Sequence, residues 1–241
     1  MGSMRRFKVF RFDPESGNYS HFDEFDVPIE KGMTVLEGLY YILENLDGSL
    51  AFRSSCRCAV CGSCAMNIND QSRLACRTLI DDLGIGTVTV RPLSNLPILK
   101  DLVVDMKPFF ENYRQTEPYL IPKEPPKEKE YHQSVDDREK INFVIDCIHC
   151  AICNADCPTF SCKENTIGPG ALSKAIRFIN DSRDRALVKR LAIVGSDLEL
   201  FSSHEKHNCQ KSCPKEIDIS GFLSRIKRME IWQRLREMIL C

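Results

Sequence analysis

The sequence lacks an apolar run of the roughly 18 residues that a helix needs to cross a bilayer, so we expect no transmembrane segment. It also lacks an excess of positive charge, because 33 Lys and Arg residues stand against 34 Asp and Glu residues. Nucleic-acid binding needs clustered positive charge to displace counterions from phosphates, so we expect no nucleic-acid partner. No apolar stretch follows Arg5 and Arg6, so we expect no secretory signal peptide.

Cysteine, by contrast, is abundant, with thirteen residues. An odd number without a secretory signal disfavours a disulfide framework, and clustered reduced thiols usually bind metal. The cysteines fall into three groups, and Cys241 stands apart from them: 56, 58, 61, 64 and 76; 147, 150, 153, 157 and 162; 209 and 213. A long cysteine-free stretch separates the first group from the second, which predicts two modules that each hold metal.

The first part of the chain has the pattern of a small sheet with one helix. Alternating apolar residues predict paired strands at 6–13 and 20–27, and a β-branched run predicts another at 87–90. Thr34 and Glu37 have the spacing of a capping box, and helical periodicity follows until Asn45. This order predicts an α+β sheet curled over one helix.

The later part of the chain has a different pattern. Residues 118–130 are rich in proline, lysine and glutamate, so we expect a surface linker that does not pack. No strand pattern appears beyond it, whereas 171–179 and 219–238 have helical periodicity. The second half is therefore predicted to be helical.

Four cysteines have the spacing of a plant-type [2Fe–2S] loop, Cys56-x4-Cys61-x2-Cys64-x11-Cys76. This arrangement gives two thiolates per iron, and Gly62 is expected to let backbone amides approach the sulfides. Cys58 would begin a [4Fe–4S] pattern with Cys61 and Cys64, but no Cys-Pro completes it, so we treat Cys58 as a non-ligand. A zinc site is the alternative, although zinc sites usually pair two CxxC knuckles and this loop does not.

A second motif is the bacterial ferredoxin run, Cys147-x2-Cys150-x2-Cys153-x3-Cys157-Pro158. Two-cluster ferredoxins repeat this run, and an imperfect repeat stands at Ser203-x2-Lys206-x2-Cys209-x3-Cys213-Pro214. In such proteins the fourth cysteine of each run ligates the other cluster. The motif therefore assigns one [4Fe–4S] cluster to Cys147, Cys150, Cys153 and Cys213.

The remaining site keeps two thiolates, Cys157 and Cys209, and needs a further ligand. Cys162 is a candidate because iron–sulfur clusters prefer soft sulfur donors. Ser203 is the other candidate, because its hydroxyl stands at the position of a missing cysteine. Loss of this third cluster is the remaining alternative.

This combination of motifs resembles the iron–sulfur subunit of the succinate dehydrogenase/fumarate reductase (complex II) family, over essentially the whole chain. Local strings agree with the resemblance: Ser55-Cys56-Arg57, Cys61-Gly62-Ser63-Cys64, Leu74-Ala75-Cys76-Arg77-Thr78, Asp101-Leu102-Val103-Val104-Asp105, and Ile167-Gly168-Pro169 with Arg177-Phe178. Two positions depart from the family: Ser203 replaces a cluster cysteine, and Cys162 stands where many members carry a tryptophan.

The resemblance implies an α+β protein with an N-terminal β-grasp [2Fe–2S] ferredoxin domain at 1–104 and an all-α two-cluster ferredoxin domain at 105–241. It implies [2Fe–2S], [4Fe–4S] and [3Fe–4S] clusters in series. The chain would then act as the electron-transfer subunit of succinate:quinone oxidoreductase or quinol:fumarate reductase. Because clusters in series conduct single electrons, no residue of this chain is needed as an acid, base or nucleophile.

The resemblance also implies partners: a flavoprotein subunit that holds FAD, and a cytochrome b-type membrane anchor that carries quinone. The chain would then sit peripherally on the cytoplasmic side of the membrane, held by the anchor. Family features place His204 and Lys227 near the quinone; a surface histidine and a solvated helix face are the alternatives. A free ferredoxin-like carrier and a subunit of a thiol- or disulfide-linked reductase are the competing functions.

Overall fold

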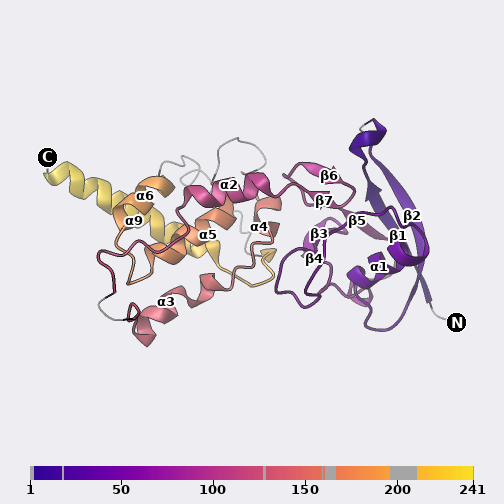
Figure 1. Cartoon of the computed structure of the whole chain (residues 1–241), viewed down its shortest axis with the longest axis horizontal. Helices are drawn as coiled ribbons and strands as arrows, with labels where there is room; N and C mark the ends of the chain where they lie inside the picture. The colour runs from indigo at the N-terminus through magenta and orange to yellow at the C-terminus, as the bar shows by residue number, and fades with distance from the viewer. Residues whose placement is uncertain are drawn as a thin grey trace. The chain divides into compact units, whose positions relative to one another are not determined.

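The structure, a computed structural model, describes residues 3–17, 19–126, 129–158, 160, 167–195 and 211–240. It divides into two compact units (Figure 1). The first unit is Met1–Met106 together with Ile148–Asp156, and the second is Lys107–Cys147 together with Cys157–Cys241. The expected domain boundary after residue 104 stays a prediction.

The first unit is built on a five-stranded sheet with the order β2-β1-β5-β3-β4. Its strands are β1 (Ser3–Arg11), β2 (His21–Ile29), β3 (Ala65–Ile68), β4 (Gln71–Leu74) and β5 (Val88–Arg91). β1 pairs antiparallel with β2 and parallel with β5. A short pair, β6 (Ile98–Lys100) and β7 (Val103–Val104), follows. The three strands predicted at 6–13, 20–27 and 87–90 are thus confirmed as β1, β2 and β5.

Helix α1 (Val35–Asn45) packs on this sheet at Gly38. A Cβ at Gly38 would lie 2.4 Å from the ring of Phe7, which is fully buried on β1. Only glycine therefore permits this close approach of helix and strand. The predicted capping box is confirmed, because Thr34 Oγ1 accepts from the Glu37 N–H while Glu37 accepts from the Thr34 N–H.

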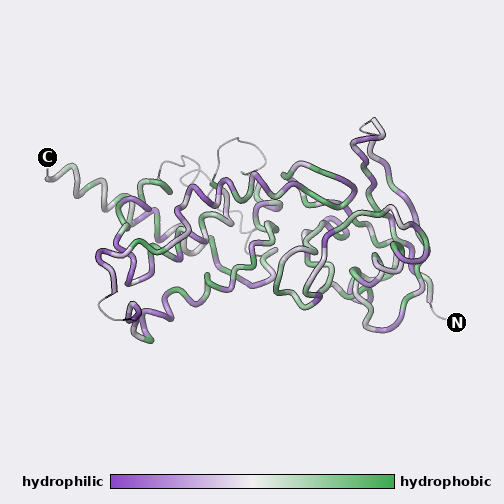
Figure 2. The backbone as a smooth tube through the Cα atoms, viewed as in Figure 1, coloured by the Kyte–Doolittle hydropathy of each residue, from purple (hydrophilic) through white to green (hydrophobic). Residues whose placement is uncertain are grey.

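The described residues of the second unit form helices joined by loops and contain no strand, in agreement with the predicted helical second half. Its helices are α2 (Lys107–Gln115), α3 (Val135–Ile145), α5 (Gly168–Ile179), α6 (Leu187–Gly195) and α9 (Ile219–Leu240). Helix α5 is central, since it contacts α2, α3, α6 and α9. No helix in the described part of the chain is long and apolar enough to cross a membrane. Figure 2 shows hydrophilic and hydrophobic stretches interspersed along the backbone of both units.

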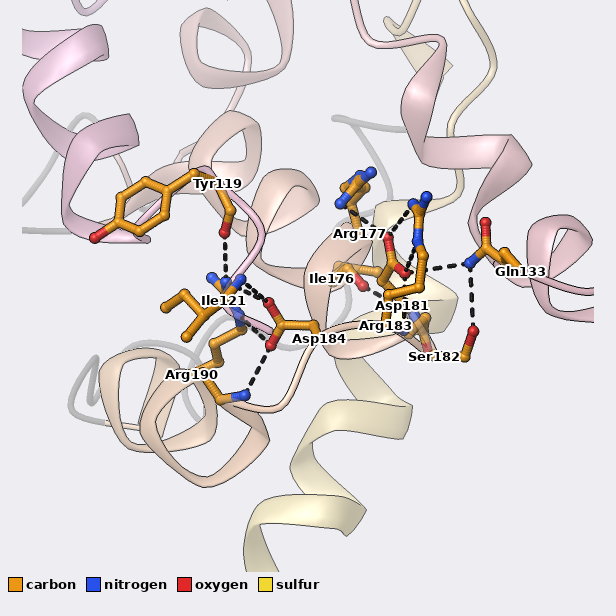
Figure 3. Close-up of polar contacts among 12 residues, drawn as sticks. Tyr119, Ile121, Gln133, Ile176, Arg177, Asp181, Ser182, Arg183, Asp184 and Arg190 are labelled. Carbon is orange, nitrogen blue, oxygen red and sulfur yellow. Dashed lines mark hydrogen bonds and ion pairs between the residues drawn. The ribbon is translucent and has the colours of Figure 1, made fainter. Parts of the chain in front are cut away.

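The expectation that residues 118–130 do not pack is wrong for the first part of that segment (Figure 3). The Ile121 N–H donates to Asp184 Oδ2 at 3.0 Å, and the Ile121 carbonyl accepts from the Arg185 N–H at 2.8 Å. The Tyr119 carbonyl accepts from Arg190 Nη2 at 2.7 Å. Backbone groups, which composition does not reveal, hold this segment against α6.

Arg190 is the centre of these contacts and is fully buried. Its guanidinium donates to both carboxylate oxygens of Asp184, at 3.0 and 2.7 Å. It also donates to the carbonyls of Thr116 and Glu117, at 3.1 and 2.9 Å. Burial alone would raise the pKa of Asp184, but hydrogen bonds from Arg190 and from backbone N–H groups lower it below its usual range. The pair is therefore charged and well satisfied, as a buried ion pair must be.

Candidate metal centres

The loop before β3 folds its backbone around one cysteine sulfur. Arg57 and Ala59 have positive φ values of 56° and 57°, which turn the chain sharply. The N–H groups of Cys58, Val60 and Cys61 then donate to Cys56 Sγ, at 3.4, 3.3 and 3.3 Å. Convergent backbone donors of this kind stabilise negative charge on sulfur.

These donors change the protonation of Cys56. They lower the pKa of its thiol to about 6, with the Cys58 N–H as the largest contributor. The thiolate is the form that binds iron, so Cys56 is prepared as a ligand before metal arrives. Cys64 differs, because burial raises the pKa of its thiol to about 12. Metal binding must therefore remove a proton at Cys64.

The sulfurs of the four predicted ligands influence one another in two pairs. Cys61 helps to lower the pKa of the Cys56 thiol, and Cys76 contributes to the raised pKa of the Cys64 thiol. The second pair follows from the β3–β4 hairpin, where the Ala75 N–H donates to the Cys64 carbonyl at 3.0 Å. Two thiolates on each of two irons is the ligand set of a [2Fe–2S] cluster, so these residues fit that group.

Among the residues that the structure describes, no group of three or more His, Cys, Asp or Glu side chains is close enough to hold a single metal ion.

Helix α1 holds one side of the cysteine loop. The Arg57 guanidinium stacks on the Tyr40 ring, 4.6 Å from its centroid. The Tyr40 hydroxyl shares a 2.5 Å hydrogen bond with Ser54 Oγ. Tyr40 therefore fixes the residues on both sides of Cys56.

Asp101 holds the approach to the same loop. This buried carboxylate accepts from the Ala51 N–H at 2.9 Å, from the Phe12 N–H at 3.0 Å and from Arg11 Nε at 3.1 Å. Val104 adds a second contact, because its carbonyl accepts from Arg53 Nη1 at 2.8 Å. The Asp101–Asp105 string, which the family resemblance shares, therefore anchors the cysteine loop, a role that its sequence alone does not indicate.

The segment Ile148–Asp156 lies in the first unit, against the cysteine loop. A Cβ placed on Gly62 would lie 2.9 Å from Cys150 Cβ and 2.9 Å from the Ile148 carbonyl oxygen. Gly62 also has a φ of +72°, which favours glycine. The [2Fe–2S] loop therefore touches the residue that the second motif predicts as a [4Fe–4S] ligand.

Hydrogen bonds fix this segment, which includes the short helix α4 (Ile152–Ala155). Ser72 on β4 donates to Asp156 Oδ1 at 2.6 Å, and Asn95 donates to the Ala155 carbonyl at 2.9 Å. Ala151 and Ile152 are buried. The ferredoxin sheet, rather than the helical unit, thus positions Cys150 and Cys153, which the linear motif did not indicate.

Other predicted ligands lie in the second unit, where Cys147, Cys157 and Cys213 are half-buried. The Ser173 hydroxyl on α5 lies 4.0 Å from Cys147 Sγ. Lys227 lies on α9 and is half-buried. Four predicted site residues lie outside the described residues: Cys162, Ser203, His204 and Cys209.

Comparisons with known proteins agree with this arrangement. Residues 6–111 match the family model described as a 2Fe-2S iron-sulfur cluster binding domain. The succinate dehydrogenase iron-sulfur subunit of Paracoccus denitrificans is 38% identical over 231 residues, covering 95% of this chain and 89% of that protein. The mitochondrial succinate dehydrogenase [ubiquinone] iron-sulfur subunit of Candida glabrata is 37% identical over 229 residues, covering 93% and 90%.

A solved structure agrees as well. A chain of the Mycobacterium smegmatis Sdh1 complex in the apo form has a TM-score of 0.88 and 26% identity, and the match covers 98% of each chain. The predicted α+β fold, with a [2Fe–2S] ferredoxin domain ahead of a helical region, is confirmed. The chain therefore belongs to the family of succinate dehydrogenase iron–sulfur subunits and serves as the electron-transfer subunit of such a complex.

Proposed function

We propose that this subunit carries single electrons between the FAD of a flavoprotein subunit and a quinone at a cytochrome b-type membrane anchor, with the chain peripheral on the cytoplasmic side. Iron–sulfur clusters, when bound, supply this chemistry because they gain and lose one electron at a time. The close approach of Gly62 to Cys150 supports the proposal most directly, because these residues belong to the loops that we propose as ligands of two different centres. A free two-cluster carrier would not need the attached [2Fe–2S] loop.

In the first centre, we propose Cys56, Cys61, Cys64 and Cys76 as ligands. Their pairing and the backbone donors at Cys56 support this ligand set. Cys58 falls outside the plant-type spacing that these four residues share, and no Cys-Pro completes the [4Fe–4S] pattern that it would begin. Cys58 therefore stays a non-ligand in this proposal.

The remaining centres are proposed from the spacing of the second motif. A [4Fe–4S] cluster takes Cys147, Cys150, Cys153 and Cys213, and a third cluster takes Cys157 and Cys209 with Cys162 or Ser203. A [3Fe–4S] cluster at the third site would complete a series toward the quinone, near His204 and Lys227. The protein adjusts such centres through ligand type, hydrogen bonds to sulfur and burial.

The two loop cysteines give a direct test in the purified complex. We expect Cys58→Ala to keep the [2Fe–2S] EPR signal of the dithionite-reduced protein and the rate of succinate-dependent quinone reduction. We expect Cys56→Ala to lose both, because it removes the ligand that three N–H groups surround. The two substitutions remove the same atom from the same loop, so each is the control for the other. Loss of the signal in Cys58→Ala with retention in Cys56→Ala would contradict the ligand assignment.

A further inference from the structure

The N-terminal half of helix α5 lies against Cys147. Ser173 is 2% exposed, and its hydroxyl lies 4.0 Å from Cys147 Sγ while donating to the Gly170 carbonyl at 2.7 Å. The next residue, Lys174, is half-buried on the same helix. A lysine thus follows directly on the residue that contacts a proposed cluster ligand.

Two aromatic rings hold the Lys174 ammonium. Its Nζ lies 5.7 Å from the centroid of Tyr113 on α2 and 5.7 Å from that of Phe178 on α5. Cation–π contacts of this kind favour the protonated amine and restrict its position. Burial raises the pKa of Tyr113 to about 12, and the charge of Cys147 adds to this, so Tyr113 also lies within electrostatic reach of the cysteine. Lys174 and Tyr113 therefore share the surroundings of Cys147.

No carboxylate in the described part of the chain pairs with Lys174. Among the described residues, Lys174 forms no ion pair, whereas the neighbouring Arg177 pairs with Asp181 at 3.0 Å. Asp181 also binds Arg183 at 2.8 Å, so that carboxylate is already shared by two cations (Figure 3). The pKa of Lys174 lies below its usual value, because burial and the charge of Arg177 lower it by more than the Cys147 sulfur raises it.

We propose that the Lys174 ammonium raises the reduction potential of the iron–sulfur centre that Cys147 ligates. A fixed positive charge in a partly buried site favours the reduced cluster, which carries one more negative charge. The centre takes up one electron from its reductant and passes one electron on, and Lys174 keeps its proton throughout. The inference rests on the proposed function, because it requires Cys147 to be a cluster ligand.

Potentiometric titration monitored by EPR tests this in the intact complex. We expect Lys174→Gln to lower the potential of the [4Fe–4S] centre by about 59 mV, a tenfold change in a one-electron equilibrium. Lys174→Arg keeps the charge, so its potential should stay near that of the wild type. The [2Fe–2S] centre is an internal reference. Lys189→Gln is the matched control, because it removes an exposed lysine of the same unit that pairs with Glu117.

The possible results separate the inference from the proposed function. An unchanged [4Fe–4S] potential in Lys174→Gln would overturn the inference alone. Equal shifts in Lys174→Gln and Lys174→Arg would also overturn it, because side-chain shape rather than charge would then be responsible. A wild-type complex without any [4Fe–4S] signal would overturn the proposed function as well.

Discussion

Replacing Gly62 with alanine is expected to disturb two iron–sulfur centres at once. The new Cβ would lie 2.9 Å from the Ile148 carbonyl oxygen and 3.0 Å from Cys150 Cα, and these backbone atoms cannot rotate away. The φ of +72° adds strain of about 1–2 kcal/mol for a residue with a Cβ. Overpacking of this kind typically adds roughly 1–3 kcal/mol. We expect lower iron and acid-labile sulfide content, with weaker EPR signals from both the [2Fe–2S] and [4Fe–4S] centres.

Gly32→Ala is the matched control for this substitution. Gly32 has a φ of +82°, similar to that of Gly62, but a Cβ there would meet nothing within 4 Å. The Gly32→Ala variant therefore has the strained backbone conformation but no steric clash. Equal cluster content in the two variants would show that the contact with Cys150 has no part in holding the centres.

Replacing Arg190 with methionine is expected to cause the largest loss of stability in the helical unit. The change leaves the buried Asp184 carboxylate without its ion-pair partner and removes donors from the carbonyls of Thr116, Glu117 and Tyr119. Breaking a buried pair on one side costs about 3–5 kcal/mol. For a chain of this size, that corresponds to a decrease in Tm of roughly 6–20 °C.

Thermal denaturation at one fixed scan rate measures this effect. Lys189→Gln is the control on the same helix. Lys189 forms an ion pair with Glu117, but the lysine side chain is exposed to solvent. Exposed pairs contribute about 0–1 kcal/mol, so this variant should denature close to the wild type. If Arg190→Met denatured at the same temperature as Lys189→Gln, the buried pair would not anchor residues 116–121 to the helical unit.

Local signals predicted three of the five strands of the main sheet. Alternation identified β1 and β2, a β-branched run identified β5, and Thr34 with Glu37 identified the start of α1. These signals succeed because they depend on side chains close in sequence. The hairpin of β3 and β4 was missed, although it brings Cys64 and Cys76 together. Its strands have only four residues each, too few to establish an alternating pattern.

Long-range contacts were not predictable in the same way. The spacing of the cysteines predicted the ligand loop, but nothing in the linear motif placed Cys150 against Gly62. That contact depends on Ser72 and Asn95, whose hydrogen bonds to the segment cross about 60 to 84 residues of chain. The packing of Ile121 was missed for a similar reason, because backbone groups rather than side chains make its contacts.

The central claim is that two iron–sulfur centres of this subunit lie close enough to exchange electrons. Low-temperature EPR of the fully dithionite-reduced complex tests it, because two nearby paramagnetic centres broaden and split each other's signals. With the Gly62 loop touching Cys150, we expect a [2Fe–2S] signal that relaxes faster and broadens once the [4Fe–4S] centre is also reduced. A [2Fe–2S] signal unchanged in width and relaxation while the [4Fe–4S] centre is reduced would contradict the account.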